Sequence, residues 1–277
     1  MVHRTAGRLH AALAGRVLVR SDLRWPSLAT VDLSDRTVLE VVARGKHLLT
    51  RVNGGASGAS GGTPLTLHSH LRMEGSWHVH GTGKPWASAR RASEVRAVLV
   101  NDQWTAVGHR LGMLDLVPTA DEHTLVGHLG PDLLGPDWDA ERVLATLREA
   151  PERAIGEAML DQRVLAGVGT LYMAESLFVR GINPWTATGR VRDLPGLLDR
   201  VQVMMRANLD RVVQTFTGDT RNGSTSWVHG RNRRPCRRCG TAIRVEPIGV
   251  APHERVAFFC PRCQPAPTDS RSARAEH

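Results

Sequence analysis

The stretch from residue 236 to residue 263, CRRCGTAIRVEPIGVAPHERVAFFCPRC, contains all four cysteines of the chain. Two residues separate Cys236 from Cys239, two separate Cys260 from Cys263, and twenty lie between the pairs. This spacing lets a tight turn direct both sulfurs of a pair onto one metal ion, and four thiolates complete a closed tetrahedral shell. A closed shell leaves no position for water, so the stretch predicts one structural Zn2+ bound by these four cysteines.

The residues between the cysteine pairs predict a β-hairpin, with strands AIRVEP (242–247) and RVAFF (255–259). Arginines gather in and around it, at positions 231, 233, 234, 237, 238, 244 and 255. So much like charge on one small module favours contact with nucleic acid. A solvated zinc ribbon without a ligand is the alternative.

N-terminal to the cysteines, AMLDQRVLAGVGTLYMAESLF (158–178) predicts two helices joined by a glycine-containing turn. Gly167 and Gly169 permit positive φ and close approach of the backbone. Thr170 is the candidate N-cap of the second helix. Free amides at such a helix start, together with the helix dipole, can bind phosphate. A turn that serves only packing explains the same pattern.

The remaining chain predicts an α+β protein of several domains. From 37 to about 117, short runs alternate polar and apolar residues between turns, which is typical of an antiparallel β-sandwich. Helical patterns follow at 139–150, 152–162, 170–180 and 196–215. The segment 53–64 predicts a flexible surface loop, and the Pro/Gly-rich segment 129–139 a connector.

We therefore expect four parts: an N-terminal helix with the β-sandwich (1–135), a helical DNA-binding domain (136–220), a four-cysteine zinc finger (221–264) and a disordered tail (265–277).

Composition narrows the class of protein. The 277 residues carry a formal charge of +9, which favours an anionic partner such as nucleic acid. The sequence shows neither an apolar run long enough to span a membrane nor a signal-peptide pattern, so a reducing cytoplasm is expected. In that compartment cysteines are more often metal ligands than disulfide partners.

The order of several motifs resembles the formamidopyrimidine-DNA glycosylase/endonuclease VIII family. They are RGKHLL (44–49), HLRMEGSW (70–77), LGPDLL (129–134), DQRVLAGVGTLYMAESL (161–177), RGINP (180–184) and HGRNRRPCRRCG (229–240). The resemblance implies a β-sandwich, a helix–two-turn–helix and a zinc-finger hairpin. It also implies base-excision repair, with a DNA glycosylase that cleaves abasic sites by β/δ-elimination. VHRTAGRL (2–9) favours the endonuclease VIII branch and hence oxidised pyrimidines as substrates.

The resemblance implies roles for individual residues. Lys46 matches a lysine that contacts phosphate and assists β-elimination. Arg255 matches the zinc-finger arginine that grips the phosphates beside the lesion and assists δ-elimination. Glu175 matches a glutamate that supports the helix–two-turn–helix. The implied partner is double-stranded DNA with a damaged base or an abasic site, bound by a monomer. The expected location is a bacterial-type cytoplasm, in association with the nucleoid.

The family flips the damaged nucleotide out of the duplex and fills the void with side chains. Arg72 and Met73 are the expected fillers, while Arg110 and Leu111 belong to the same DNA-contacting set. Leu111 takes the place of a common wedge phenylalanine. Thr170 takes the place of an asparagine, and with Gly167 and Gly169 it is expected to contact phosphate.

The start of the chain departs from the family pattern. VHRTAGRLHAAL predicts an amphipathic helix that is closed near Gly15, with no capping residue before Val2. Family members act through an N-terminal proline amine and an adjacent glutamate, and the sequence has neither at this point. We expect either a recorded start about five residues late or a chain without the nucleophile.

Two other functions fit parts of the sequence. A damaged-DNA-binding protein without catalysis would follow from a true loss of the proline and glutamate. A basic zinc-ribbon protein that binds RNA or scaffolds other proteins would follow from the cysteine module alone.

Overall fold

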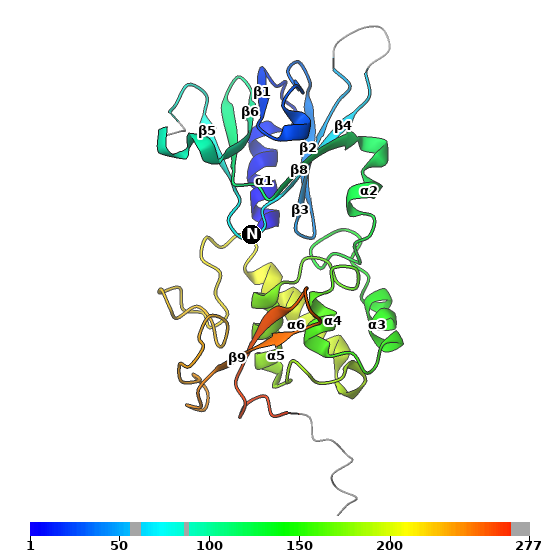
Figure 1. Ribbon diagram of the computed structural model, residues 1–277, viewed down its shortest axis with the longest axis vertical. Coiled ribbons are helices and arrows are strands. Elements are labelled where there is room, and N and C mark those ends of the chain that lie inside the picture. Colours follow the sequence, from blue (N-terminus) through cyan, green and yellow to red (C-terminus); the bar gives the residue numbers. More distant parts are fainter. Residues whose placement is uncertain (56–61, 86–88, 267–277) are drawn as a thin grey trace, which may run out of the picture. The chain divides into compact units, whose positions relative to one another are not determined.

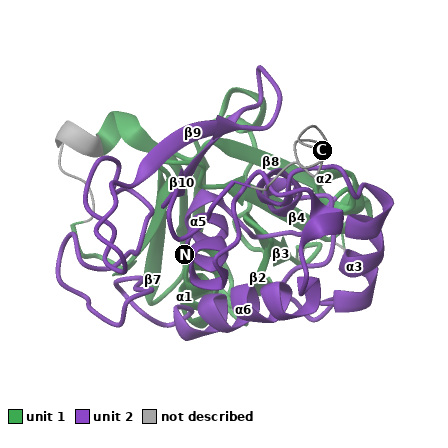
Figure 2. Cartoon of the chain, turned by 90° about the horizontal axis from the view of Figure 1, so that it is seen from below, with its two compact units in different colours: residues 1–128 green, residues 129–277 purple. Residues whose placement is uncertain are grey.

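The computed structural model describes residues 1–55, 62–85 and 89–266 (Figure 1). The chain divides into two compact units, Met1–His128 and Leu129–His277 (Figure 2). Much of the loop expected at 53–64, and nearly all of the tail expected at 265–277, lie outside the described residues. The finer boundaries expected at 135/136 and 220/221 stay predictions.

Unit 1 contains two antiparallel four-stranded sheets. One has the order β1-β6-β7-β5, with strands Arg20–Leu23, Val95–Val100, Trp104–His109 and Ser76–Gly81. The other has the order β2-β3-β4-β8, with strands Val38–Arg44, His47–Val52, Leu65–His70 and Met113–Pro118. Short helical turns are η1 (Pro26–Leu28), η2 (Ala89–Glu94), η3 (Thr119–Asp121) and α2 (His123–Val126).

Helix α1 (Val2–Leu13) packs against both sheets, as its sequence pattern predicts (Figure 1). Ala6, Leu9 and Leu13 recur at helical spacing, are buried, and share one apolar core with residues of all eight strands. The helix ends before Gly15, whose φ of +73° suits a residue without a side chain. The antiparallel β-sandwich is therefore confirmed, with α1 as part of its core.

Unit 2 contains the predicted helices, and two of them differ in extent from the prediction. The elements are α3 (Ala140–Glu149), α4 (Ile155–Leu160), α5 (Thr170–Arg180), η4 (Thr188–Arg190), α6 (Leu194–Ala207), β9 (Arg244–Ile248) and β10 (Arg255–Phe259). Helix α4 is shorter than 152–162. Helix α6 was predicted at 196–215 but starts earlier, because Asp193 caps it by accepting a 2.8 Å bond from the Gly196 amide. It also ends earlier, because the side chain of Asn208 bonds both backbone groups of Thr215.

The core of unit 2 joins the helices to the hairpin. Ile248 of β9 and Ala257 of β10 are buried in the same apolar cluster as Ile155 of α4 and Leu177 of α5. A Cβ on Gly156 would lie 2.7 Å from Ile248 Cδ1, so glycine is what lets α4 and the hairpin approach so closely. Within the described residues, none of the helices has the length and apolar character needed to cross a membrane.

Candidate nucleic-acid interface and metal centre

The four cysteines lie together, as their spacing predicts. Their Sγ atoms are all within 4.8 Å of one another, with 3.9 Å between Cys236 and Cys263 and 3.5 Å between Cys239 and Cys260. Four sulfurs at about 2.3 Å from a tetrahedral zinc ion lie about 3.8 Å apart, so the set fits zinc. Two backbone amides donate towards the sulfurs: that of Arg238 to Cys236 and that of Cys263 to Cys260.

The hairpin between the cysteine pairs is confirmed. Strands β9 and β10 pair antiparallel, with Arg255 opposite Ile248 at the start of β10, next to the loop that connects the two strands. The Arg255 side chain is exposed, while Ala257 and Phe259 on the same strand are buried. The hairpin thus holds Arg255 at the surface of unit 2 on a packed element.

Several of the clustered arginines stabilise the fold. Arg231 is 8% exposed, and its guanidinium donates to the carbonyls of Trp227 and Pro235. Arg237 donates to two backbone carbonyls, and Arg238 lies 4.5 Å over the ring of Phe178. Six of the seven arginines are exposed, at positions 233, 234, 237, 238, 244 and 255, so Arg231 is the one withdrawn from an anionic partner.

The turn between α4 and α5 has one of the two expected positive-φ glycines. Gly167 has φ +95°, and its amide donates a 3.0 Å bond to the side-chain oxygen of Gln162. Gly169 has an extended backbone, so the expectation of positive φ there is wrong. Gly169 also stands at the N-cap, which corrects the prediction for Thr170: the threonine is the first residue of the helix. Because glycine has no capping side chain, the amides of the first turn remain available to an anion.

Lys46 lies at the turn between β2 and β3. Arg44 pairs with His47 in the register, so Gly45 and Lys46 form a two-residue connection in which Gly45 has φ +59°. Lys46 is half-buried. The turn fixes the backbone from which the Lys46 side chain extends.

Imidazoles surround this turn, and sequence reasoning missed them. His47 Nδ1 lies 2.8 Å from His68 Nε2, and the His47 ring contacts those of His70 and His128 at centroid distances of 5.0 and 6.3 Å. The available signal was the alternation of His68 and His70 in one strand, directly beside the strand that follows Lys46. Burial, together with the neighbouring imidazoles and Lys46, lowers the pKa of His47 to about 3.

The expected lesion-contacting residues lie at two adjacent loops of unit 1. The Gly112 amide donates to the carbonyl of His70, which holds the loop after β4 beside the loop after β7. Arg72 and Arg110 have φ of +49° and +46°, a region that costs non-glycine residues energy and is enriched at functional sites. Met73 is 97% exposed, which rules out a core methionine.

Two members of this set differ from expectation. Leu111 is 3% exposed and belongs to the sandwich core, so in this conformation it cannot insert beside a base. Arg110 is exposed but forms ion pairs with Glu74 and Glu94. The ion pair with Glu74 ties Arg110 to the loop that carries the exposed Met73, and a contact of Arg110 with DNA stays a prediction.

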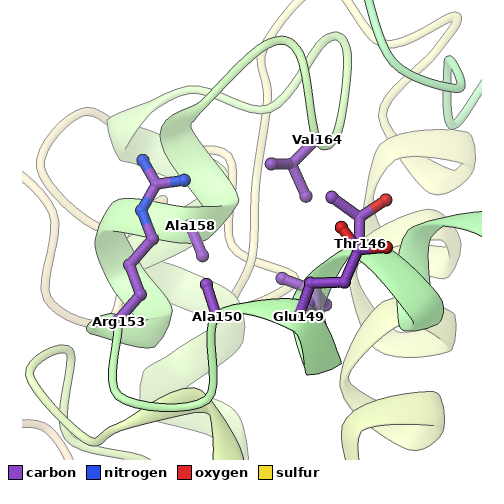
Figure 3. Close-up of a pocket in the computed structure, with 7 residues that line it drawn as sticks. Thr146, Glu149, Ala150, Arg153, Ala158 and Val164 are labelled. Carbon is purple, nitrogen blue, oxygen red and sulfur yellow. The ribbon is translucent and has the colours of Figure 1, made fainter.

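One cavity in unit 2 is unrelated to these residues. It measures about 170 Å³ and is lined by Thr146, Leu147, Glu149, Ala150, Arg153, Ala158 and Val164 (Figure 3). The guanidinium of Arg153 pairs with Glu157 at 2.9 Å and with Asp161 at 3.1 Å. With its cation already paired, the cavity offers no chemistry.

Comparison with known proteins gives two family models that cover most of the chain. The formamidopyrimidine-DNA glycosylase N-terminal domain matches residues 2–113, and the formamidopyrimidine-DNA glycosylase H2TH domain matches residues 129–216.

Curated relatives match over nearly the whole length. A probable endonuclease 8 2 of Streptomyces coelicolor is 50% identical, over 99% of this chain and 95% of its own. A DNA-(apurinic or apyrimidinic site) lyase Nei2 of Mycolicibacterium smegmatis is 43% identical, over 96% and 97%. The solved structure of Lactococcus lactis Fpg with DNA containing an abasic site has the same fold, with a TM-score of 0.72 at 23% identity, covering 96% of this chain and 98% of that one. The chain belongs to the formamidopyrimidine-DNA glycosylase/endonuclease VIII family.

Proposed function

We propose that this protein is a base-excision-repair DNA glycosylase with abasic-site lyase activity, and that its substrates are oxidised pyrimidines in double-stranded DNA. The identity of 50% to an endonuclease 8 relative carries the proposal, because it extends over nearly the full length of both chains. The protein acts as a monomer in a bacterial cytoplasm. Its cysteines hold one structural zinc ion.

The proposal gives several residues a role in binding DNA. Lys46 and Arg255 each neutralise a phosphate near the lesion, and the planar guanidinium of Arg255 offers two donors to one phosphate. The amides at the start of α5, beside Gly167, Gly169 and Thr170, hold a further phosphate. Exposed Met73 fills the space that the flipped nucleotide leaves.

The reaction needs an unprotonated amine that attacks the anomeric carbon of the damaged nucleotide. The base leaves, an iminium forms between the amine and the sugar, and that iminium accepts electrons as the 3′ phosphate is eliminated. In this family the amine belongs to an N-terminal proline. In the chain as printed, the terminal amine is that of Met1. Burial and the positive charge of Arg4 lower the pKa of this amine.

Schiff-base trapping with borohydride on a duplex containing an abasic site tests the function. Two forms are compared: the chain as printed, and a chain in which Pro-Glu-Gly-Asp-Thr precedes Val2. We expect trapping and strand cleavage by the second form, since displacing the nucleophile by even about 1 Å costs on the order of a hundredfold in rate.

The printed form should bind the abasic duplex but be trapped poorly. Failure of the extended form to cleave would contradict the enzyme assignment. A preference of either form for RNA over the abasic duplex would favour a zinc-ribbon RNA-binding protein. Robust base excision by the printed form would mean that another residue is the nucleophile.

A further inference from the structure

Three neighbouring strands of unit 1 place a row of polar side chains beside Lys46. In the register, His47 of β3 lies opposite His70 of β4, Leu49 lies opposite His68, and His68 lies opposite Asp115 of β8. These positions point to one face of the sheet, because side chains alternate along a strand and opposed residues share a face.

Two hydrogen bonds join this row into a chain. Nδ1 of His68 lies 3.0 Å from Oδ2 of Asp115, and Nε2 of His68 lies 2.8 Å from Nδ1 of His47. His68 is the centre of the chain and is 1% exposed, so water does not replace either bond. Asp115 is partly exposed at one end, and His47 lies next to Lys46 at the other.

The chemistry of the groups fixes the direction of the chain. An ionised carboxylate only accepts, so Nδ1 of His68 carries the proton and donates to Asp115. In a neutral ring Nε2 is then the acceptor, and it receives the proton of His47 Nδ1. This leaves Nε2 of His47 as an acceptor without a proton. The same logic orients a catalytic histidine through a buried aspartate.

The surroundings favour neutral rings at this site. Burial lowers the pKa of His47 to about 3 and that of His70 to about 4, and the neighbouring imidazoles and the charge of Lys46 act in the same direction. Arg72 adds to the effect on His70. These histidines do not have the geometry of a metal site. Among the described residues, the four cysteines are the group whose ligand atoms lie close enough together to hold an ion.

We propose that Asp115 and His68 are positioning residues: they hold His47, the neighbour of Lys46, in one tautomer and orientation, and so fix the turn from which Lys46 reaches a DNA phosphate. The proposal rests on the proposed function through the role of Lys46. It assigns no contact with substrate to Asp115 or His68.

The tautomers can be measured without DNA. Nitrogen-detected NMR of the full chain labelled with 15N-histidine distinguishes protonated Nδ1 from protonated Nε2. We expect both His47 and His68 to carry the proton on Nδ1 at pH 7.5. In Asp115→Asn the side chain can either accept from His68 Nδ1 or donate to it, so we expect a second population to appear in which His47 is protonated on Nε2. Unchanged tautomers in this variant, or Nε2 protonation in the parent, overturn the proposal.

A double-mutant cycle tests the link to Lys46. Asp115→Asn preserves the shape of the side chain and should weaken binding to an abasic-site duplex about fivefold, the scale of one hydrogen bond. In a Lys46→Ala background the same change should have no further effect, since coupled residues are not additive. Ser69→Ala is the matched control: it lies on β4 and loses a 3.1 Å bond to Trp77 on the core side of the sheet, so binding should not change.

The outcomes separate the two proposals. Weaker binding by Lys46→Ala, with an additive effect of Asp115→Asn, overturns the positioning role and leaves the proposed function intact. Unchanged binding by Lys46→Ala contradicts the role of Lys46 and the positioning role together. An equal fall in binding for Ser69→Ala would show that Asp115 acts only through the stability of the sheet.

Discussion

The carboxylate of Glu175 accepts a 2.8 Å hydrogen bond from the backbone amide of His229, which ties α5 to the segment that leads into the cysteine module. The amides of Trp227 and Val228 donate to the same carboxylate, and the Glu175 side chain is fully buried. Burial raises the pKa of Glu175, and the three amides offset part of that rise. The supporting role that the family resemblance implied therefore has a physical basis.

Replacing this carboxylate should destabilise unit 2. In Glu175→Gln the new NH2 group replaces one carboxylate oxygen and faces the amide of Trp227 or those of Val228 and His229. Because the buried charge is also lost, we expect the free energy of unfolding to fall by about 2–4 kcal/mol. Urea unfolding, monitored through hydrogen exchange of the α5 amides, measures the change in the free energy of unfolding. Glu149→Gln, exposed on α3, is the control and should have little effect. Equal stability of the two variants would contradict this account.

Zinc should hold the C-terminal module together. We expect one zinc ion per chain by elemental analysis, and Cys239→Ser should lose it, because three thiolates cannot close the tetrahedral shell. Hydrogen-exchange protection should disappear from β9 and β10 and persist in the strands of unit 1. A metal-free preparation with full affinity for DNA would contradict the prediction.

Features that one short segment specifies were predicted from the sequence, and features that depend on contacts between distant segments were not. Cysteine spacing and the pattern of α1 are local, and the structure confirms the clustering of the four cysteines and the helix. Strand β1 was missed, since RSDL has no apolar alternation and its pairing with β6 depends on residues about 75 positions away. The burial of Leu111 and the chain from Asp115 to His47 depend on strand register, which no single segment specifies.

Met73 should matter for damaged DNA and not for undamaged DNA. Its side chain is 97% exposed at the loop after β4, so Met73→Ala removes little from the folded protein. We expect a loss of about 1–3 kcal/mol in binding to a duplex with a flipped lesion, the scale of filling an unstacked site. Fluorescence anisotropy on matched damaged and undamaged duplexes measures it. An equal loss on both would contradict the role of a void filler.

The histidines beside Lys46 should make the fold sensitive to acid. The folded-state pKa values of about 3 for His47 and about 4 for His70 lie below the ordinary value of 6.5. Between these limits the unfolded chain binds more protons, so the free energy of unfolding falls as pH falls from 6.5 towards 3 and is independent of these groups above about pH 7.5.

Urea unfolding at pH 7.5 and at pH 5 checks this dependence on pH. His47→Asn retains a donor near the position of Nδ1 and cannot titrate, so the difference in stability between the two pH values should shrink. His123→Asn, exposed on α2, should leave that difference unchanged. If His47→Asn behaved like His123→Asn, the buried imidazole would not be the source of the acid sensitivity.

Arg255 should contribute to binding through a phosphate. It is exposed at the start of β10, while its neighbours Ala257 and Phe259 anchor the strand, so Arg255→Ala should leave the fold intact. Each phosphate contact that a protein loses reduces the slope of log affinity against log salt by roughly one unit on duplex DNA. We therefore expect Arg255→Ala to weaken binding to an abasic duplex most at low salt and to flatten the slope by about that amount.

Arg148→Ala removes an exposed charge of equal size from α3, away from the hairpin, and should leave the slope nearly unchanged. Identical slopes for the two variants would show that Arg255 adds only to the general positive field and grips no phosphate.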